Sequence, residues 1–115
     1  MALNYPERPY PELGLQGLKQ SLNDPNPVVN IASAMALGEI GAAALEILLE
    51  TLQTTDNVAL AVSIVNALAS VGGEQAVEVL TALCQDDATD RYVQETATSA
   101  LSRMEMVQKY SRPDS

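Results

Sequence analysis

The sequence predicts an all-α protein, an α-solenoid built from about three stacked helical hairpins. The segment Leu37–Gly41, with the sequence LGEIG, is echoed by Leu68–Gly72 (LASVG) and more weakly by Leu101–Glu105 (LSRME). The echoes recur with a period in the low thirties, which leaves room for two helices and their turns in each unit. No stretch alternates apolar and polar residues over the length of a strand, so we expect no sheet.

Loop signals recur at the same phase, at Asp24–Pro27, Thr54–Asn57 and Asp86–Asp90. A pair of leucines precedes each loop: Leu18 and Leu22, Leu48 and Leu52, and Leu80 and Leu83. One such unit cannot bury its apolar side alone, whereas about three stacked units form a continuous core. We therefore expect one domain over residues 12–107, with repeats at about 12–41, 42–72 and 73–107.

Proline, glycine and capping residues mark the ends of the individual helices. Pro27 suits a first helical turn, where the missing N–H is tolerated, and Gly41 suits the position after a helix end. Asp90 and either Asp56 or Asn57 are candidate N-caps. The expected helices are about Glu12–Asn23, Pro27–Ile40, Ala42–Gln53, Asn57–Val71, Gly73–Gln85 and Asp90–Gln108.

The two ends of the chain lie outside these repeats. Prolines among Tyr5 and Tyr10 predict an extended arm over residues 1–11, because proline disfavours helix in the residue before it. Residues 108–115 show no apolar period and predict a flexible tail. The first half of the last helix is more polar than its counterparts, which suits a cap on the C-terminal end of the solenoid.

Composition excludes several classes of function. The 115 residues include 15 acidic and 6 basic side chains, a net charge of −9 that argues against a nucleic-acid partner. The absence of His and the single Cys exclude His-based catalysis, an imidazole zinc site and an internal disulfide. No apolar run approaches the roughly 18 residues of a membrane span, and no secretory signal is evident. We expect a cytoplasmic protein without a metal or cofactor.

The segment Val29–Gly41 (VNIASAMALGEIG) resembles the second helix of a HEAT-like repeat, in the short form found in phycobilisome lyase-type proteins. The Asp24–Pro25 turn is also typical of that form. The resemblance covers about residues 13–105 and implies an α-solenoid that serves as a scaffold. It also implies a partner among the phycobiliproteins, since proteins of that type attach or remove bilins or assist phycobilisome turnover.

The chain departs from this family at one position. The second helix of each family repeat usually carries an Arg just after its Val, where the Arg pairs with a loop Asp. The equivalent positions here are Asn30, Ala61 and Gln94. We therefore expect no Asp–Arg ladder and a stack held together almost entirely by aliphatic packing.

Helical periodicity predicts a binding row on the concave surface. It places Val29, Ala32, Ala36 and Ile40 toward the stack, with Gly38 on the opposite side. Carried through the three repeats, the opposite side gives the row Ile31, Met35, Val62, Asn66, Glu95 and Ser99. Two interpretations stay open: the apolar members are buried, under the Tyr5/Tyr10 arm for example, or they line a groove for another protein.

The acidic residues form a second candidate surface, comprising Glu46, Glu50, Glu74, Glu78, Asp86 and Asp87. Two of its pairs have i, i+4 spacing, so each pair lies on one face of a helix. Either this surface only keeps the protein soluble or it attracts a basic partner. The Asp86–Asp90 segment lacks the Gly and the distal Glu of a calcium loop, and Cys84 is expected to be a buried small apolar residue.

These observations favour a non-enzymatic adaptor or scaffold that binds another protein through the concave row. The alternative is an accessory factor or subunit in phycobiliprotein bilin attachment or removal, or in phycobilisome turnover. A small assembly chaperone is a third interpretation. If the chain belongs to an enzyme, we expect it to be a bilin lyase-related subunit. The sequence leaves the oligomeric state open.

Overall fold

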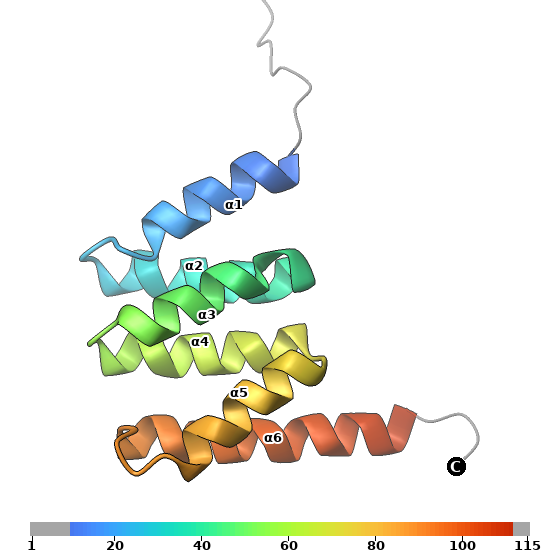
Figure 1. Cartoon of the computed structure of the whole chain (residues 1–115). Helices are drawn as coiled ribbons and strands as arrows, with labels where there is room; N and C mark the ends of the chain where they lie inside the picture. The colour runs from blue at the N-terminus through green and yellow to red at the C-terminus, as the bar shows by residue number, and fades with distance from the viewer. Residues whose placement is uncertain (1–9, 112–115) are drawn as a thin grey trace, which may run out of the picture.

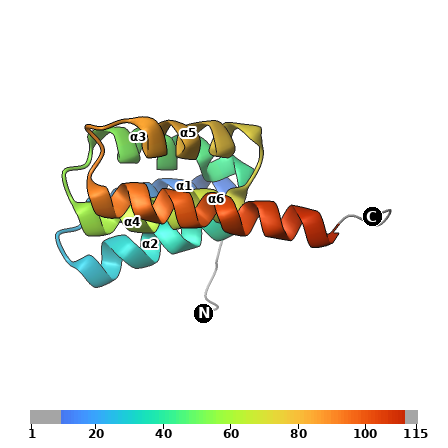
Figure 2. The same ribbon diagram turned by 90° about the horizontal axis from the view of Figure 1, so that it is seen from below.

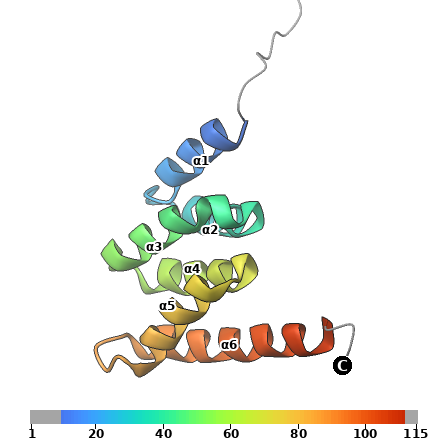
Figure 3. The same ribbon diagram turned by 45° about the vertical axis from the view of Figure 1, so that its right-hand side comes forward.

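The computed structural model describes the backbone of residues 10–111 and the side chains of residues 14–107. The helices are α1 (Tyr10–Ser21), α2 (Pro27–Ile40), α3 (Leu45–Thr54), α4 (Val58–Val71), α5 (Glu74–Gln85) and α6 (Arg91–Ser111), with a 3₁₀ turn at Ala42–Ala44. Residues 10–111 contain no strand. Three hairpins, α1/α2, α3/α4 and α5/α6, are stacked along the molecule (Figures 1 and 3). The predicted all-α solenoid is confirmed.

The hairpins form two layers. Helices α2, α4 and α6 follow one another in one layer, with α2 and α6 both packed against α4, while α3 and α5 lie in the other layer (Figure 2). The shortest dimension of the molecule is 19 Å, against 55 and 41 Å for the other two. That thickness corresponds to two helices of about 10 Å each, so each layer is one helix thick and has one face without a third layer over it.

The helices begin and end at the proline, glycine and capping residues of the sequence. Helix α2 spans the predicted residues, and the Asn26 side chain before it accepts a 2.9 Å hydrogen bond from the Val28 N–H. Gly41 and Gly72 follow α2 and α4 with φ values of 96° and 73°, a region that suits glycine because it has no Cβ. Asn57, one of two candidate caps, is the N-cap of α4.

The ends of the repeat domain differ from the predicted boundaries. Helix α1 begins at Tyr10, so the last two residues assigned to the arm are helical, and residues 1–9 lie outside the described part. Helix α6 continues to Ser111, into the segment assigned to the tail. The C-terminal part of α6 is polar and charged, so no apolar periodicity marks where the helix ends. The predicted end of the last repeat is therefore too early.

The core is aliphatic, rich in alanine and centred on α4. Six residues of that helix are buried: Leu60, Ala61, Ile64, Val65, Ala67 and Leu68. The first leucine of the last two predicted pairs, Leu48 and Leu80, is fully buried on α3 and α5, and Leu22 is buried at the end of α1. Alanines allow the helices of the α2–α4–α6 layer to approach closely, which favours a tight stack of short repeats.

The packed side of α2 differs from the predicted one. The residues expected to face the stack were Val29, Ala32, Ala36 and Ile40, but Ala32 and Ile40 are exposed. The buried residues are instead Asn30, Ser33, Ala34, Leu37 and Gly38. Because α2 is apolar or small on every side and packs against both α1 and α4, periodicity alone could not fix its rotation.

Side-chain amides occupy two of the three positions at which the resemblance implies arginine. Asn30, only 4% exposed, donates from Nδ2 to the Asp24 carbonyl oxygen at 3.0 Å. Gln94 donates from Nε2 to the Asp86 carbonyl oxygen at 2.7 Å. In the first and third repeats a side-chain amide therefore ties the second helix to the loop before it, so aliphatic packing is not the only cohesion.

Candidate functional site

The predicted binding row lies on the outer side of the α2–α4–α6 layer. Met35, Asn66 and Ser99 occupy equivalent places on the three helices and are all exposed, Met35 by 60%. Glu95 is exposed as well, whereas Ile31 and Val62 are half-buried and Val62 packs against the core. Four of the six predicted residues are therefore accessible along one face, and the two aliphatic ones are partly covered.

Two exposed side chains of the same face were missed by the sequence analysis. Val28 and Tyr92 are the second residues of α2 and α6 and are largely exposed. They lie two helical turns before Met35 and Ser99 on the same side of each helix, and that spacing is the signal that could have identified them. With them, the α2 end of the face carries two large apolar side chains, Val28 and Met35.

The α4–α6 end of the face is polar and hollowed. A depression of about 380 Å³ is lined by Asn66, Tyr92, Glu95, Thr96, Ser99 and Arg103. Arg103 donates from Nη2 to the Asn66 Oδ1 at 2.8 Å, and the Arg91 Nε lies 3.2 Å from the Glu95 Oε2. The charged groups at this end thus have partners within the chain, and the face changes from apolar on α2 to hydrogen-bonding on α6.

The acidic residues lie on the other layer. All six are exposed, on α3, on α5 and in the loop after α5, so the structure does not bring them together with the row. Glu50 lies 3.6 Å from the Lys19 Nζ, and both side chains are more than half exposed, so this ion pair contributes little stability. Asp86 accepts a 2.9 Å hydrogen bond from the Ala88 N–H, which gives it a role in the loop turn.

Cys84 is half-buried and its Sγ lies 3.3 Å from the Thr98 Oγ1. Within residues 14–107, no three Cys, Asp or Glu side chains gather in a way that could hold a metal ion. No helix in the described part of the chain is both long and apolar enough to cross a membrane.

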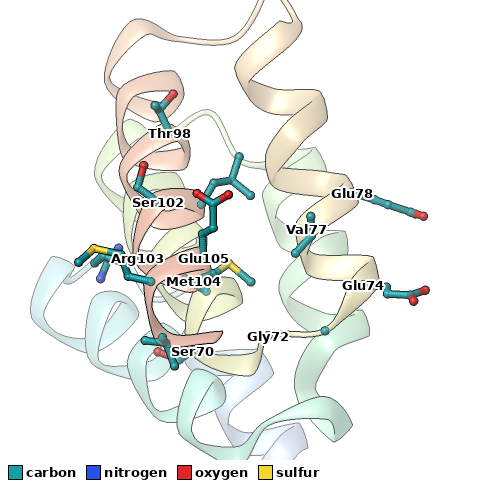
Figure 4. A pocket seen from close by; sticks show the side chains of 15 residues that line it. Ser70, Gly72, Glu74, Val77, Glu78, Thr98, Ser102, Arg103, Met104 and Glu105 are labelled. Carbon is teal, nitrogen blue, oxygen red and sulfur yellow. The ribbon is translucent and has the colours of Figure 1, made fainter. Parts of the chain in front are cut away.

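A larger groove, also missed by the sequence analysis, lies at the α5–α6 end of the solenoid. It has a volume of about 1460 Å³ and is lined by α5, the second half of α6 and the end of α4 (Figure 4). The polar first half of α6 had suggested a cap, but the residues after it include Leu101, Met104 and Met106. The signal was Leu101 itself, which continues the repeat of Leu37 and Leu68.

Comparisons with known proteins identify the family of the chain. A family model described as HEAT repeats matches residues 15–102. The chain is 59% identical over 108 residues to "Uncharacterized phycocyanin operon protein Z" of Pseudanabaena tenuis (strain PCC 7409), covering 94% of this chain and 54% of that protein. It is 30% identical over 109 residues to "Bilin biosynthesis protein CpeZ" of Synechococcus sp. (strain WH8020), covering 90% and 58%. No solved structure matches significantly.

The chain therefore spans about half the length of the curated relatives it matches. The family match covers most of the chain, from α1 to α6, and so includes all three hairpins. It agrees with the resemblance carried by Val29–Gly41 and with the stacked hairpins of the structure. The chain belongs to the HEAT-repeat family.

Proposed function

We propose that this chain is a non-enzymatic binding module that holds a phycobiliprotein subunit on the α2–α4–α6 face while a bilin is attached or removed. The observation that carries the proposal is the exposed row of equivalent side chains, apolar at Met35 and polar at Asn66 and Ser99. A repeated row on stacked helices offers one continuous surface to an extended partner.

The chemistry of the face suits binding better than catalysis. Exposed Met and Val side chains gain free energy when a partner removes them from water, and Met adapts to different partner shapes. Tyr92 adds a rigid aromatic side chain, a type that often dominates the binding energy of interfaces. Asn66 and Ser99 can satisfy polar groups of the partner, which gives orientation and specificity.

The identity of the partner comes from the relatives. One is named for a phycocyanin operon and the other for bilin biosynthesis. Both names favour a phycobiliprotein over an unrelated partner. Because this chain spans about half of each relative, we assign it a binding role within that process and leave the chemical step to other components.

The proposal is tested by capture of purified apo-phycocyanin α and β subunits on the immobilised chain. Met35→Asp should weaken capture about tenfold, because a partner would have to bury an unpaired carboxylate. Met106→Asp is the matched control: Met106 has nearly the same exposure, 56% against 60% for Met35, but lies on the far end of α6. Capture that survives Met35→Asp unchanged, or no capture by the natural chain, would reject this role for the face.

A second measurement separates a binding module from a bilin carrier. We expect the visible absorbance of a free bilin to stay unchanged when the chain alone is added. We expect the chain to change the rate or yield of bilin attachment only when apo-phycocyanin and the attaching enzyme are both present. A spectral shift with the chain alone would replace the module proposal with one in which the chain handles the bilin directly.

A further inference from the structure

Three leucines that are equivalent in the repeats differ in burial. Leu37 on α2 and Leu68 on α4 are 0% exposed, because the next hairpin of the stack covers each of them. Leu101, at the same place on α6, is only half-buried. The side of α6 that would receive a following hairpin is therefore built as a helix-packing surface, and no helix within the described residues lies on it.

The groove at this place has an apolar floor between α5 and α6. Val77 on α5 points toward α6 (Figure 4), and Leu101 and Met104 line the groove from α6. Farther along α6, Met106 and Val107 are exposed because α6 extends past the end of α5 (Figure 2). Two methionines in the lining suit a surface that accepts a flexible range of apolar side chains.

The border of the groove is acidic. Glu74 and Glu78 extend from α5 on the side away from α6, and Glu105 lines the groove from α6 (Figure 4). The basic residue in the lining is Arg103, whose guanidinium is already hydrogen-bonded to the Asn66 Oδ1 at 2.8 Å. An apolar floor with glutamates at its border complements a helix that has an apolar stripe flanked by Lys and Arg.

The same charges argue against a second copy of this chain as the occupant. Each copy carries a net charge of −9, and pairing two grooves would bring the two sets of glutamates together. Like charges brought close across an interface oppose association. A basic helix instead meets an attractive field before contact, which speeds its association.

We propose that the α5–α6 groove is a docking site for one basic amphipathic helix of a partner protein, which lies on α6 as a following hairpin would. The site goes beyond the proposed function, because it lies on a different part of the molecule from the α2–α4–α6 face. Its test needs no phycobiliprotein, so either proposal can fail alone.

The test uses a fluorescein-labelled synthetic peptide of about 14 residues, roughly four helical turns, with Leu on one face and Lys on the other. A second peptide has Glu in place of every Lys. Fluorescence anisotropy against the whole chain should show binding of the Lys peptide only. The binding should weaken as NaCl rises from about 0.05 M to about 0.5 M, because salt screens the exposed charges. Equal binding of the Glu peptide would overturn the choice of a basic occupant.

Two pairs of variants locate the binding. Val77→Asp should weaken it about tenfold by placing a carboxylate in the apolar floor, whereas Val28→Asp, on the α2–α4–α6 face, should not. The double variant Glu74→Lys with Glu78→Lys should weaken binding far more than Glu46→Lys with Glu50→Lys. Both double variants change the net charge equally, and each alters an exposed i, i+4 pair of glutamates. A difference between their peptide affinities therefore reflects the position of the charges at the groove and not the total charge.

Circular dichroism of each variant shows that a loss of binding is not a loss of fold. If Val28→Asp weakens binding and Val77→Asp does not, the peptide binds the other face and the proposal is wrong. The proposal also fails if the two charge doubles weaken binding equally. Sedimentation equilibrium tests whether a second copy of the chain occupies the groove instead. If the natural chain is a dimer and Val77→Asp is a monomer, the groove is assigned to a second copy.

Discussion

Gly38 of α2 lies directly against Ala67 of α4, so closely that a Cβ added to Gly38 would be 2.9 Å from both the Cα and the Cβ of Ala67. Real Cβ atoms essentially never come that near to another carbon, and one of the two atoms belongs to the backbone, which cannot simply rotate away. The contact lies toward the C-terminal ends of α2 and α4. It fixes how closely the first two hairpins of the solenoid approach.

Gly38→Ala should destabilise the protein although it improves the helix propensity of α2. Overpacking at a rigid contact costs about 1–3 kcal/mol, and replacing Gly by Ala in a helix recovers at most about 1 kcal/mol. We expect the free energy of unfolding to fall by about 1–2 kcal/mol in urea denaturation followed by circular dichroism.

Gly17→Ala in α1 is the matched control, since no described atom lies within 4 Å of a Cβ added there. It should raise the free energy of unfolding by about 0.5–1 kcal/mol, because only the helix propensity changes. The two identical substitutions should therefore have opposite signs. A Gly38→Ala variant as stable as the natural chain would show that α2 and α4 do not pack as closely as described.

The amides of Asn30 and Gln94 allow a second comparison, in which each is replaced by its isosteric acid. Both donate to a loop carbonyl oxygen, but Asn30 is buried and Gln94 is half-exposed. Asn30→Asp loses the donor and places a carboxylate against a carbonyl in the protein interior. At neutral pH it should cost about 3 kcal/mol, since buried unpaired charges are strongly unfavourable.

Gln94→Glu makes the same chemical change where water can reach the new carboxylate, so it should cost only about 1 kcal/mol. The thermal unfolding midpoints of the two variants, measured at equal pH, check the order. Equal losses would mean that burial does not distinguish the two sites. The loop–helix bond would then be the only contribution of Asn30.

Much of this fold follows from the sequence, because glycine, proline and capping residues act locally. Pro27 and Gly41 determine the two ends of α2 by their own backbone preferences, so both ends could be predicted without any neighbours. The rotation of α2 about its axis could not, because it depends on which sides α1 and α4 cover. The burial of Gly38 likewise could not be predicted locally, because it results from contact with Ala67 in the next repeat.

The candidate surfaces show the same division. The repeat register in the sequence predicts that Met35, Asn66 and Ser99 occupy equivalent positions. The structure places all three on one exposed face. The α5–α6 groove is only partly predictable: Leu101 continues the repeat of Leu37 and Leu68, but its exposure depends on the absence of a packed helix over it within the described residues. The part of α6 that lines it also lies beyond the polar stretch that suggested a cap.

Asn57 and Asp56 differ as helix caps, although the sequence could not choose between them. Asn57 Oδ1 accepts a 3.1 Å hydrogen bond from the Leu60 N–H at the start of α4. The Asp56 side chain is exposed and makes no hydrogen bond to the described residues. Asn57→Ala should lower the free energy of unfolding by about 1 kcal/mol, the usual cost of losing a cap.

Asp56→Ala should change stability by less than about 0.5 kcal/mol, as is usual for an exposed substitution without a partner. Urea denaturation at equal ionic strength compares the two, because removal of Asp56 also changes the net charge. If Asp56→Ala proves the more costly variant, α4 begins one residue earlier than the structure places it.

Leu68 and Leu101 test the inference that the last repeat has an open packing surface. They occupy the same place in consecutive repeats, but Leu68 is fully buried and Leu101 is half-buried. Leu68→Ala should cost about 3 kcal/mol, since it leaves a cavity in the central helix. Leu101→Ala should cost only about 1 kcal/mol, because part of its surface is already in water.

Chemical denaturation of the free chain measures both losses of stability. If Leu101→Ala is as costly as Leu68→Ala, its surface is covered in solution and the groove is not free to receive a partner helix.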